Sequence, residues 1–144
     1  MITLVPATAL PRVLTAVDLK KIGTATARVL KATGRIEVGV RFVSLKEMQT
    51  LNKTFRGKNR PTDVLSFEAR VEEIEGSKEL YWGDLAICTD YAKEEAKRRG
   101  LSTREELARL LIHGILHLAG YDHATTEEEL EMFAIQERVL ETIL

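Results

Sequence analysis

All three histidines of the chain lie within eleven residues, in the stretch LLIHGILHLAGYDH from Leu110 to His123. His113 and His117 are four residues apart in an apolar run, so on a helix both imidazoles point to one face. Gly120 follows where the helix should end, because glycine accepts the left-handed geometry of a C-terminal cap, and the chain can then bring His123 round. Three neutral imidazoles with one position open to water are typical of a catalytic zinc site. The spacing therefore predicts one Zn²⁺ ion held by the three histidines.

Other interpretations of the histidines have less support. A single histidine on an apolar helix is commonly a core residue, and a pair at four-residue spacing arises by chance, but this arrangement of three rarely does. The spacing also matches the metzincin peptidase pattern H-E-x-x-H-x-x-G-x-x-H at every position but one, since Gly114 stands where the glutamate would act as general base. That replacement argues against peptidase activity.

A second segment suited to chemistry is RGKNRPTDVLSF, from Arg56 to Phe67. It begins as a basic loop with a glycine and a proline and ends as a short strand. The basic residues in and beside it are Lys53, Arg56, Lys58 and Arg60. A charge run is usually a solvated surface, but around a glycine it lets guanidinium groups and backbone amides approach one anion together. Phosphate is the natural candidate for that anion, so these residues are predicted to bind phosphate groups.

Two aspartates are candidates for supporting roles. Asp84, next to Gly83 in YWGDLAIC, is expected to be either a turn or edge residue or a partner that orients a ligand histidine. Asp122 precedes a predicted ligand and is a candidate base, although we prefer a turn-capping role beside Gly120.

The elements that position these residues follow from hydrophobic periodicity. Strands are expected at 2–5, 36–43, 64–67 and 81–88, and a polar hairpin or loop at 69–80. Helices are expected at 15–30, 44–55, 90–99 and 102–119, followed by a last helix that begins after Thr125. Capping boxes are predicted at the helix starts Ser44, Ser102 and Thr125. Apolar residues expected on the inner faces of these helices include Val17, Leu45, Phe55, Leu130 and Phe133.

This order of elements favours an α+β fold with one domain over residues 1–144, in which helices pack on a small mixed sheet. From Leu110 onward the histidine helix is apolar nearly all round. Such a helix is expected to be central and buried, so the domain would carry a metzincin-like zinc helix on its most rigid element.

Composition restricts the partners. With 144 residues, 44% of them hydrophobic, the chain can build one real core. The formal net charge is −1, so an anionic partner must be held by a local patch and not by a global positive field. The lone Cys88 cannot form an internal disulfide and is expected to be a buried thiol in a strand. Without an export signal or a membrane span, the expected location is the cytoplasm.

Taken together and in this order, RGKNRPTDVLSF, WGDLAIC and HGILHLAGYDH resemble the YbeY family of bacterial ribosomal-RNA maturation factors, over roughly Leu51 to Leu144. The resemblance implies a single-strand-specific, metal-dependent endoribonuclease. It would act in 3′-end maturation of small-subunit rRNA and in ribosome quality control, with the small ribosomal subunit and assembly proteins as partners. The metal would lie on the three matching histidines, and the family's functionally important arginine falls on Arg56. Asn59, where an aspartate is common, and Trp82 depart from the family pattern.

In the predicted mechanism, the metal polarises a phosphoryl oxygen or supplies a bound hydroxide, while Arg56 holds the phosphate. Because Gly114 cannot act as a base, a slow enzyme is expected. Water and the 2′-hydroxyl both remain candidate nucleophiles. Two other functions stay open: a non-catalytic ribosome-assembly factor with a structural metal, and a metzincin-like peptidase whose glutamate would come from outside the motif.

Overall fold

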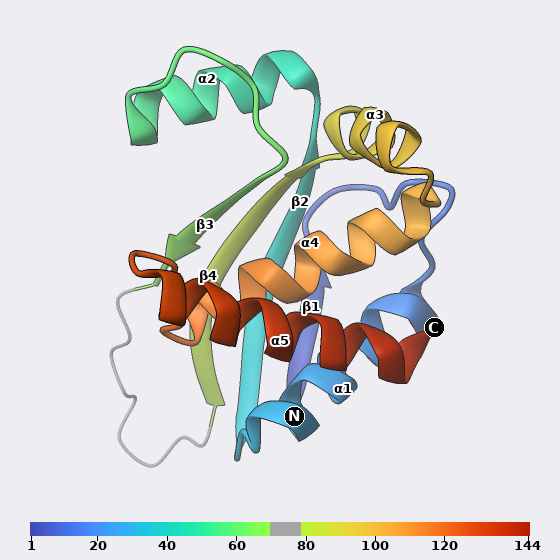
Figure 1. Ribbon diagram of the computed structural model, residues 1–144, viewed down its shortest axis with the longest axis vertical. Coiled ribbons are helices and arrows are strands. Elements are labelled where there is room, and N and C mark those ends of the chain that lie inside the picture. The colour runs from blue at the N-terminus through green and yellow to red at the C-terminus, as the bar shows by residue number, and fades with distance from the viewer. Residues whose placement is uncertain (70–78) are drawn as a thin grey trace.

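The computed structural model describes residues 1–69 and 79–144 of the chain (Figure 1). The predicted hairpin or loop at 69–80 falls largely outside the described residues. The elements of the described part are β1 (Ile2–Pro6), α1 (Ala16–Leu30), β2 (Arg35–Val43), α2 (Leu45–Arg56), β3 (Val64–Glu68), β4 (Glu79–Cys88), α3 (Thr89–Arg99), α4 (Thr103–Leu118) and α5 (Thr126–Ile143). Within this part, no helix is long and apolar enough to cross a membrane.

The four strands form one mixed sheet in the order β1-β2-β4-β3. β2 is parallel to both β1 and β4, and β3 is antiparallel to β4 and forms an edge of the sheet. The inner face of β2 carries the buried side chains of Ile36, Val38 and Val40, and Glu37 and Arg41 alternate with them and are exposed. The predicted small mixed sheet is therefore confirmed.

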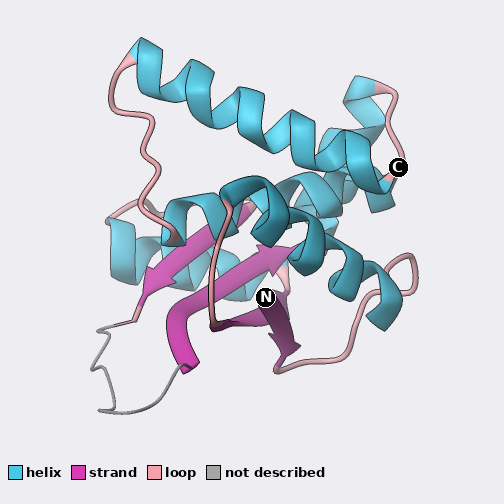
Figure 2. Cartoon of the chain, turned by 90° about the horizontal axis from the view of Figure 1, so that it is seen from below, coloured by secondary structure: helices cyan, strands magenta, loops and turns pink. Residues whose placement is uncertain are grey.

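The helices cover both faces of the sheet unequally. The main core cluster joins α1, α4 and α5 to one face, on which Leu85 and Ile87 of β4 lie, and Figure 2 shows these helices stacked on the same side of the strands. A smaller cluster on the other face joins Ala86 and Cys88 to Met48 of α2. Successive residues of β4 thus point to opposite helical layers, and Cys88 is the buried thiol that was predicted.

α4 is the central helix of the larger layer. Leu107, Leu111, Ile112, Ile115 and Leu116 are fully buried in it, which confirms the prediction of a buried helix. Its side chains contact the sheet and α5, so the residues on its last two turns are held on a rigid support.

Helix starts agree with the sequence in part. Ser44 forms the predicted reciprocal capping box with Glu47. Ser102 and Thr125 each accept one backbone N–H, but the glutamate three residues on does not return the bond to either cap. A full capping box between Thr15 and Asp18, which was not predicted, opens α1.

Five apolar side chains that were expected on inner faces are exposed instead: Val17, Leu45, Phe55, Leu130 and Phe133. Val17 and Leu45 lie in the first turns of α1 and α2, before these helices reach the core. The buried stripe of α5 is formed by Met132, Gln136, Val139 and Leu140. At helical spacing, Phe133 falls on the margin of that stripe and Leu130 beyond it, so both side chains remain open to solvent.

Candidate functional site

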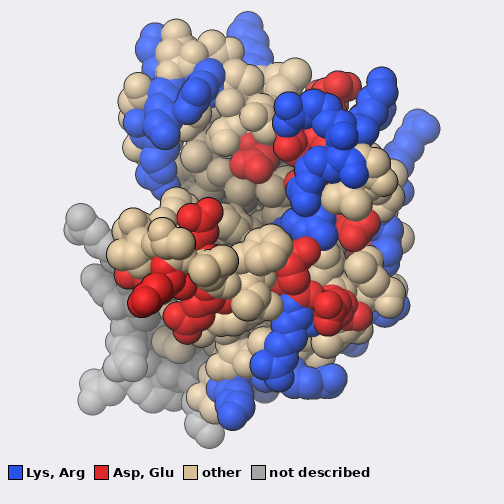
Figure 3. Space-filling model, in the orientation of Figure 1, with Lys and Arg blue, Asp and Glu red and all other residues tan. Residues whose placement is uncertain are grey.

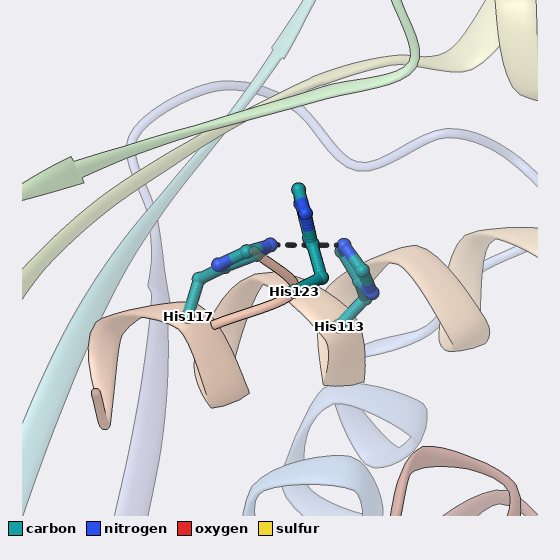
Figure 4. A group of neighbouring side chains, drawn as sticks. All are labelled: His113, His117 and His123. Carbon is teal, nitrogen blue, oxygen red and sulfur yellow. Dashed lines mark hydrogen bonds between the residues drawn. The ribbon is translucent and has the colours of Figure 1, made fainter. Parts of the chain in front are cut away.

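The three histidines converge at the end of α4. His113 and His117 lie on its last two turns, and His123 returns from the following turn so that its ring faces the other two (Figure 4). One ring nitrogen from each residue can be chosen so that all lie within 4.8 Å of one another. The Nε2 atoms of His113 and His117 are 3.1 Å apart. In a tetrahedral zinc site, two histidine nitrogens are separated by about 3.3 Å, so the spacing of the His113–His117 pair fits one such ion.

The turn after α4 is what brings His123 back. Gly120 adopts a positive φ of 101°, and its N–H donates to the carbonyl of His117 while that of Tyr121 donates to Leu116, both at 3.0 Å. This pair of bonds is a Schellman motif, the glycine-dependent helix end that was predicted. The carboxylate of Asp122 accepts the backbone N–H of His123 at 2.7 Å, so Asp122 caps the turn, as preferred from the sequence.

His113 is oriented by Gln136, which was not among the predicted site residues. Its Nδ1 lies 2.8 Å from Oε1 of Gln136, which is buried on α5. Because an amide oxygen only accepts, Nδ1 must carry the proton, which leaves the Nε2 lone pair facing the other histidines. Gln136 in turn donates to Glu137, whose carboxylate is gripped by two nitrogens of Arg109 at 3.0 Å each. The feature of the sequence that could have indicated this role is the position of Gln136, a polar residue, within the apolar stripe of α5.

The site also favours an uncharged imidazole at His117. Burial, followed by the neighbouring His113 and His123, lowers the pKa of His117 below its ordinary value. A neutral imidazole is the form that binds a metal ion. Three nitrogen donors suit zinc and related transition metals, so the residues present fit the predicted metal.

A cleft of about 870 Å³ joins the histidines to the basic segment. β3 lines it, with the turn of Tyr121 to His123 on one side and Arg56, Lys58 and Arg60 on the other. In Figure 3, lysine and arginine side chains gather over α2 beside the hollow, and acidic side chains over the start of α5 face them. Lys53 is not among the residues that line the cleft.

Arg56 is held by contacts with β3. Its Nη2 donates to the carbonyl of Ser66 at 2.8 Å, and its guanidinium carbon lies 5.9 Å from the ring centroid of Phe67. Phe55 packs edge-on against the same ring, with centroids 5.1 Å apart. The exposed Phe55 therefore supports Arg56 and not the core.

Comparison with known proteins identifies the family. The family model described as Endoribonuclease YbeY matches residues 12–144. The chain belongs to the YbeY family. It is 42% identical over 132 residues to the endoribonuclease YbeY of Bacillus pumilus, covering 86% of this chain and 82% of that protein. It is 46% identical over 110 residues to that of Bacillus licheniformis, covering 72% and 70%. A solution structure from Thermotoga maritima is similar, with a TM-score of 0.62 and 33% identity over 99% of this chain and 89% of that one.

In this member of the YbeY family, Asp84 does not approach the histidines. It pairs with Gly39 in the sheet and lies next to it, where Tyr81 donates a hydrogen bond to its carboxylate. The adjacent Leu85 points to α4, so Asp84 points to the opposite face of the sheet. The prediction that Asp84 orients a ligand histidine is therefore wrong.

Gly114, which stands where the metzincin pattern has its glutamate, faces the sheet. A Cβ added there would lie 2.7 Å from a terminal methyl of Leu85, which is fully buried. α4 therefore approaches β4 more closely than a larger residue would allow. A side chain at position 114 would start toward Leu85, which is consistent with the absence of a base from this part of the motif.

Proposed function

We propose that the protein is a metal-dependent endoribonuclease that cleaves single-stranded RNA, with residues 1–144 forming one catalytic domain. The observation that carries this proposal is one cleft in which three converging histidines face Arg56. Membership of the YbeY family supports RNA as the substrate. We further propose a role in 3′-end maturation of small-subunit rRNA and in ribosome quality control, in the cytoplasm, with the small ribosomal subunit and assembly proteins as partners.

His113, His117 and His123 would hold one Zn²⁺ ion. When bound, such an ion supplies a Lewis acid for a phosphoryl oxygen and lowers the pKa of a coordinated water toward about 7. Gln136 keeps the donor nitrogen of His113 directed into the site. The turn built on Gly120 and Asp122 does the same for His123.

Arg56 is the residue proposed to act on the phosphate. Its guanidinium has five N–H donors, and the bonds to Ser66 and Phe55 leave others for the cleft. Two parallel donors match two oxygens of a phosphate, and the charge offsets negative charge that develops in the transition state. Lys58 and Arg60 line the same wall and would contact flanking phosphates, with Lys53 farther out.

The expected turnover is slow. A positioned general base contributes about 10²- to 10⁴-fold in rate, and Gly114 supplies none. Asp122 lines the cleft, but its carboxylate already accepts the N–H of His123. Catalysis would therefore depend on the metal site and on Arg56 more than on proton transfer to a side chain.

The two alternative functions make different predictions. A ribosome-assembly factor with a structural metal would lose its fold when a histidine is replaced, yet α4 is buried through leucine and isoleucine side chains. A peptidase would need a glutamate beside the metal, whereas Gly114 faces Leu85. Both observations support the nuclease proposal.

The test measures metal content and cleavage of matched single-stranded and duplex RNA. The wild type should carry about one ion per chain and cleave the single strand, and His117→Ala should lose both properties. Arg56→Lys keeps the charge but loses the bidentate grip, so its cleavage rate should fall at least tenfold. Lys58→Ala and Arg60→Ala should mainly weaken binding and reduce its salt dependence.

Thermal stability of the three cleft variants should stay close to that of the wild type, because all three residues are exposed. If Arg56→Lys cleaves RNA at the wild-type rate, the catalytic role proposed for Arg56 is wrong. Chelator-sensitive cleavage of peptides by the purified protein would restore the peptidase alternative.

A further inference from the structure

A second groove lies on the other side of the histidines from Arg56. It has a volume of about 500 Å³, and its lining includes His113 and His123, which also line the main cleft. The buried side chains of Met132 and Gln136 contribute to it, and the exposed residues along it include Glu129, Leu130 and Phe133. The two grooves therefore adjoin at the proposed reaction centre.

The apolar part of this groove is unusually open. Leu130 and Phe133 are 63% and 55% exposed, although both lie on a helix whose other side is in the core. Packing in the core therefore does not explain why these two positions are apolar. An aromatic ring beside a cleft that holds phosphates is suited to stacking on a nucleobase, because every base has an apolar face.

Charge restricts which part of a nucleic acid enters the groove. The start of α5 carries Glu127, Glu128, Glu129 and Glu131, which would repel phosphates. The opposite wall of the main cleft carries Arg56, Lys58 and Arg60, which would attract them. A strand that crosses the histidines should therefore place its phosphates against α2 and β3 and turn its bases toward α5.

Glu129 adds a polar contact to this arrangement. Within the described part of the chain, its carboxylate has no hydrogen bond or ion pair, and it lines the groove beside Phe133. A carboxylate accepts hydrogen bonds only, so it suits the exocyclic amino group of adenine, cytosine or guanine.

We infer that the groove formed by Glu129, Leu130, Met132, Phe133 and Gln136 binds one unpaired nucleobase next to the scissile phosphate, stacked on Phe133. The inference rests on the proposed RNA-cleaving function and adds a subsite to it. A base inside a duplex is stacked on both faces and paired at its edge, so it cannot enter without being extruded. The subsite would thus contribute to selection of single strands.

The experiment compares two substrates. One is a short single-stranded RNA, and the other lacks the base at a single position beside the cleaved bond. Binding is measured by fluorescence anisotropy and cleavage by kcat/KM, for the wild type, Phe133→Ala and Phe133→Trp. Val17→Ala, which shortens an exposed apolar side chain on α1, is the matched control.

Phe133→Ala should weaken binding of the intact RNA by about five- to a hundredfold, and Phe133→Trp should retain it. On the abasic RNA, Phe133→Ala should bind within about twofold of the wild type, because the stacking partner is absent. 2-Aminopurine placed at that position should be quenched by the wild type and less by Phe133→Ala. Val17→Ala should match the wild type throughout.

Three results would overturn the inference. If Phe133→Ala binds intact RNA normally while Arg56→Lys loses cleavage, the subsite is wrong and the proposed function stands. If Phe133→Ala loses the same affinity for both substrates, the ring does not act through that base. If the metal-loaded wild type neither binds nor cleaves RNA, the proposed function fails together with the subsite.

Discussion

Gln136 is a positioning residue of the proposed metal site, because it contacts His113 and not the ion. Its amide oxygen fixes which nitrogen of His113 carries the proton, and hydrogen-bond partners of this kind change metal affinity by about 10- to 100-fold when they are removed. We expect Gln136→Leu to weaken metal binding by that factor, measured by competition with a chromophoric chelator. The loss of the hydrogen bonds to His113 and Glu137 should lower the free energy of unfolding by only about 2 kcal/mol.

Gln49→Leu provides the control, because it makes the same change in a glutamine of α2 that donates to Asn59, away from the histidines. Its metal affinity should equal that of the wild type. Unchanged metal affinity in Gln136→Leu would mean that the turn and α4 alone orient the ligands.

The three candidate metal ligands could be predicted from the sequence, but the residue that orients His113 could not. The reason is physical. The three histidines are local in the chain, so helical spacing and one glycine determine how they meet. Gln136 reaches His113 only through the packing of α5 on α4. Asp84 was misplaced because the run LAIC after it is apolar at every position, so no polar alternation indicates which face it occupies.

Among the helices, the contact that joins the starts of α1 and α4 is expected to depend on pH. Arg104 donates to Asp18 at 2.6 Å and, with the Thr15 backbone, lowers the pKa of that carboxyl from 3.8 to about 2. A carboxyl with a lowered pKa stabilises the fold fully above its unfolded pKa of about 4 and loses this effect as the pH falls toward 2. Arg104 is 44% exposed, so solvent screening limits the effect to about 1 kcal/mol.

Asp18→Asn should therefore lower the free energy of unfolding at pH 7, and the difference from the wild type should disappear near pH 2. Urea unfolding at a series of pH values measures this difference. Glu141→Gln, which changes an exposed carboxylate on α5, is measured beside it as the control. A constant difference across the series would assign the effect of Asp18 to its capping geometry and not to its charge.

The positions of helices and strands along the chain were predictable because capping residues and hydrophobic periodicity are local features. Which neighbouring element each helix packs against was not predictable, because it depends on tertiary contacts. A Cβ at Gly23 would lie 2.2 Å from the carbonyl oxygen of Ile2, so α1 lies against β1 only because this position is glycine. The hydrophobic periodicity of α1 does not indicate this close contact between α1 and β1. The exposed Phe133 is a similar case, since its surroundings depend on where α5 crosses α4.

For the whole molecule, the hydrophobic core is expected to stay folded after the metal is removed. The main cluster joins the sheet to α1, α4 and α5 through apolar side chains. Chelation should leave the far-UV circular dichroism spectrum unchanged and lower the Tm only by the loss of ligand binding energy. His117→Ala should give the same spectrum with no response to the chelator. Unfolding on chelation would favour the assembly factor with a structural metal.

The outer edge of β3 has a consequence for association between chains. Among the strands that the structure describes, β3 pairs only with β4. The N–H of Val64 nevertheless donates to the carboxylate of Asp63 at 2.7 Å, and the carbonyl of Ser66 accepts from Arg56. A second polypeptide that added a strand at this edge would have to break both bonds. Arg56 and Asp63 thus protect the edge from self-association and from extended peptides, whereas a nucleic acid needs no ladder of backbone bonds to occupy the same cleft.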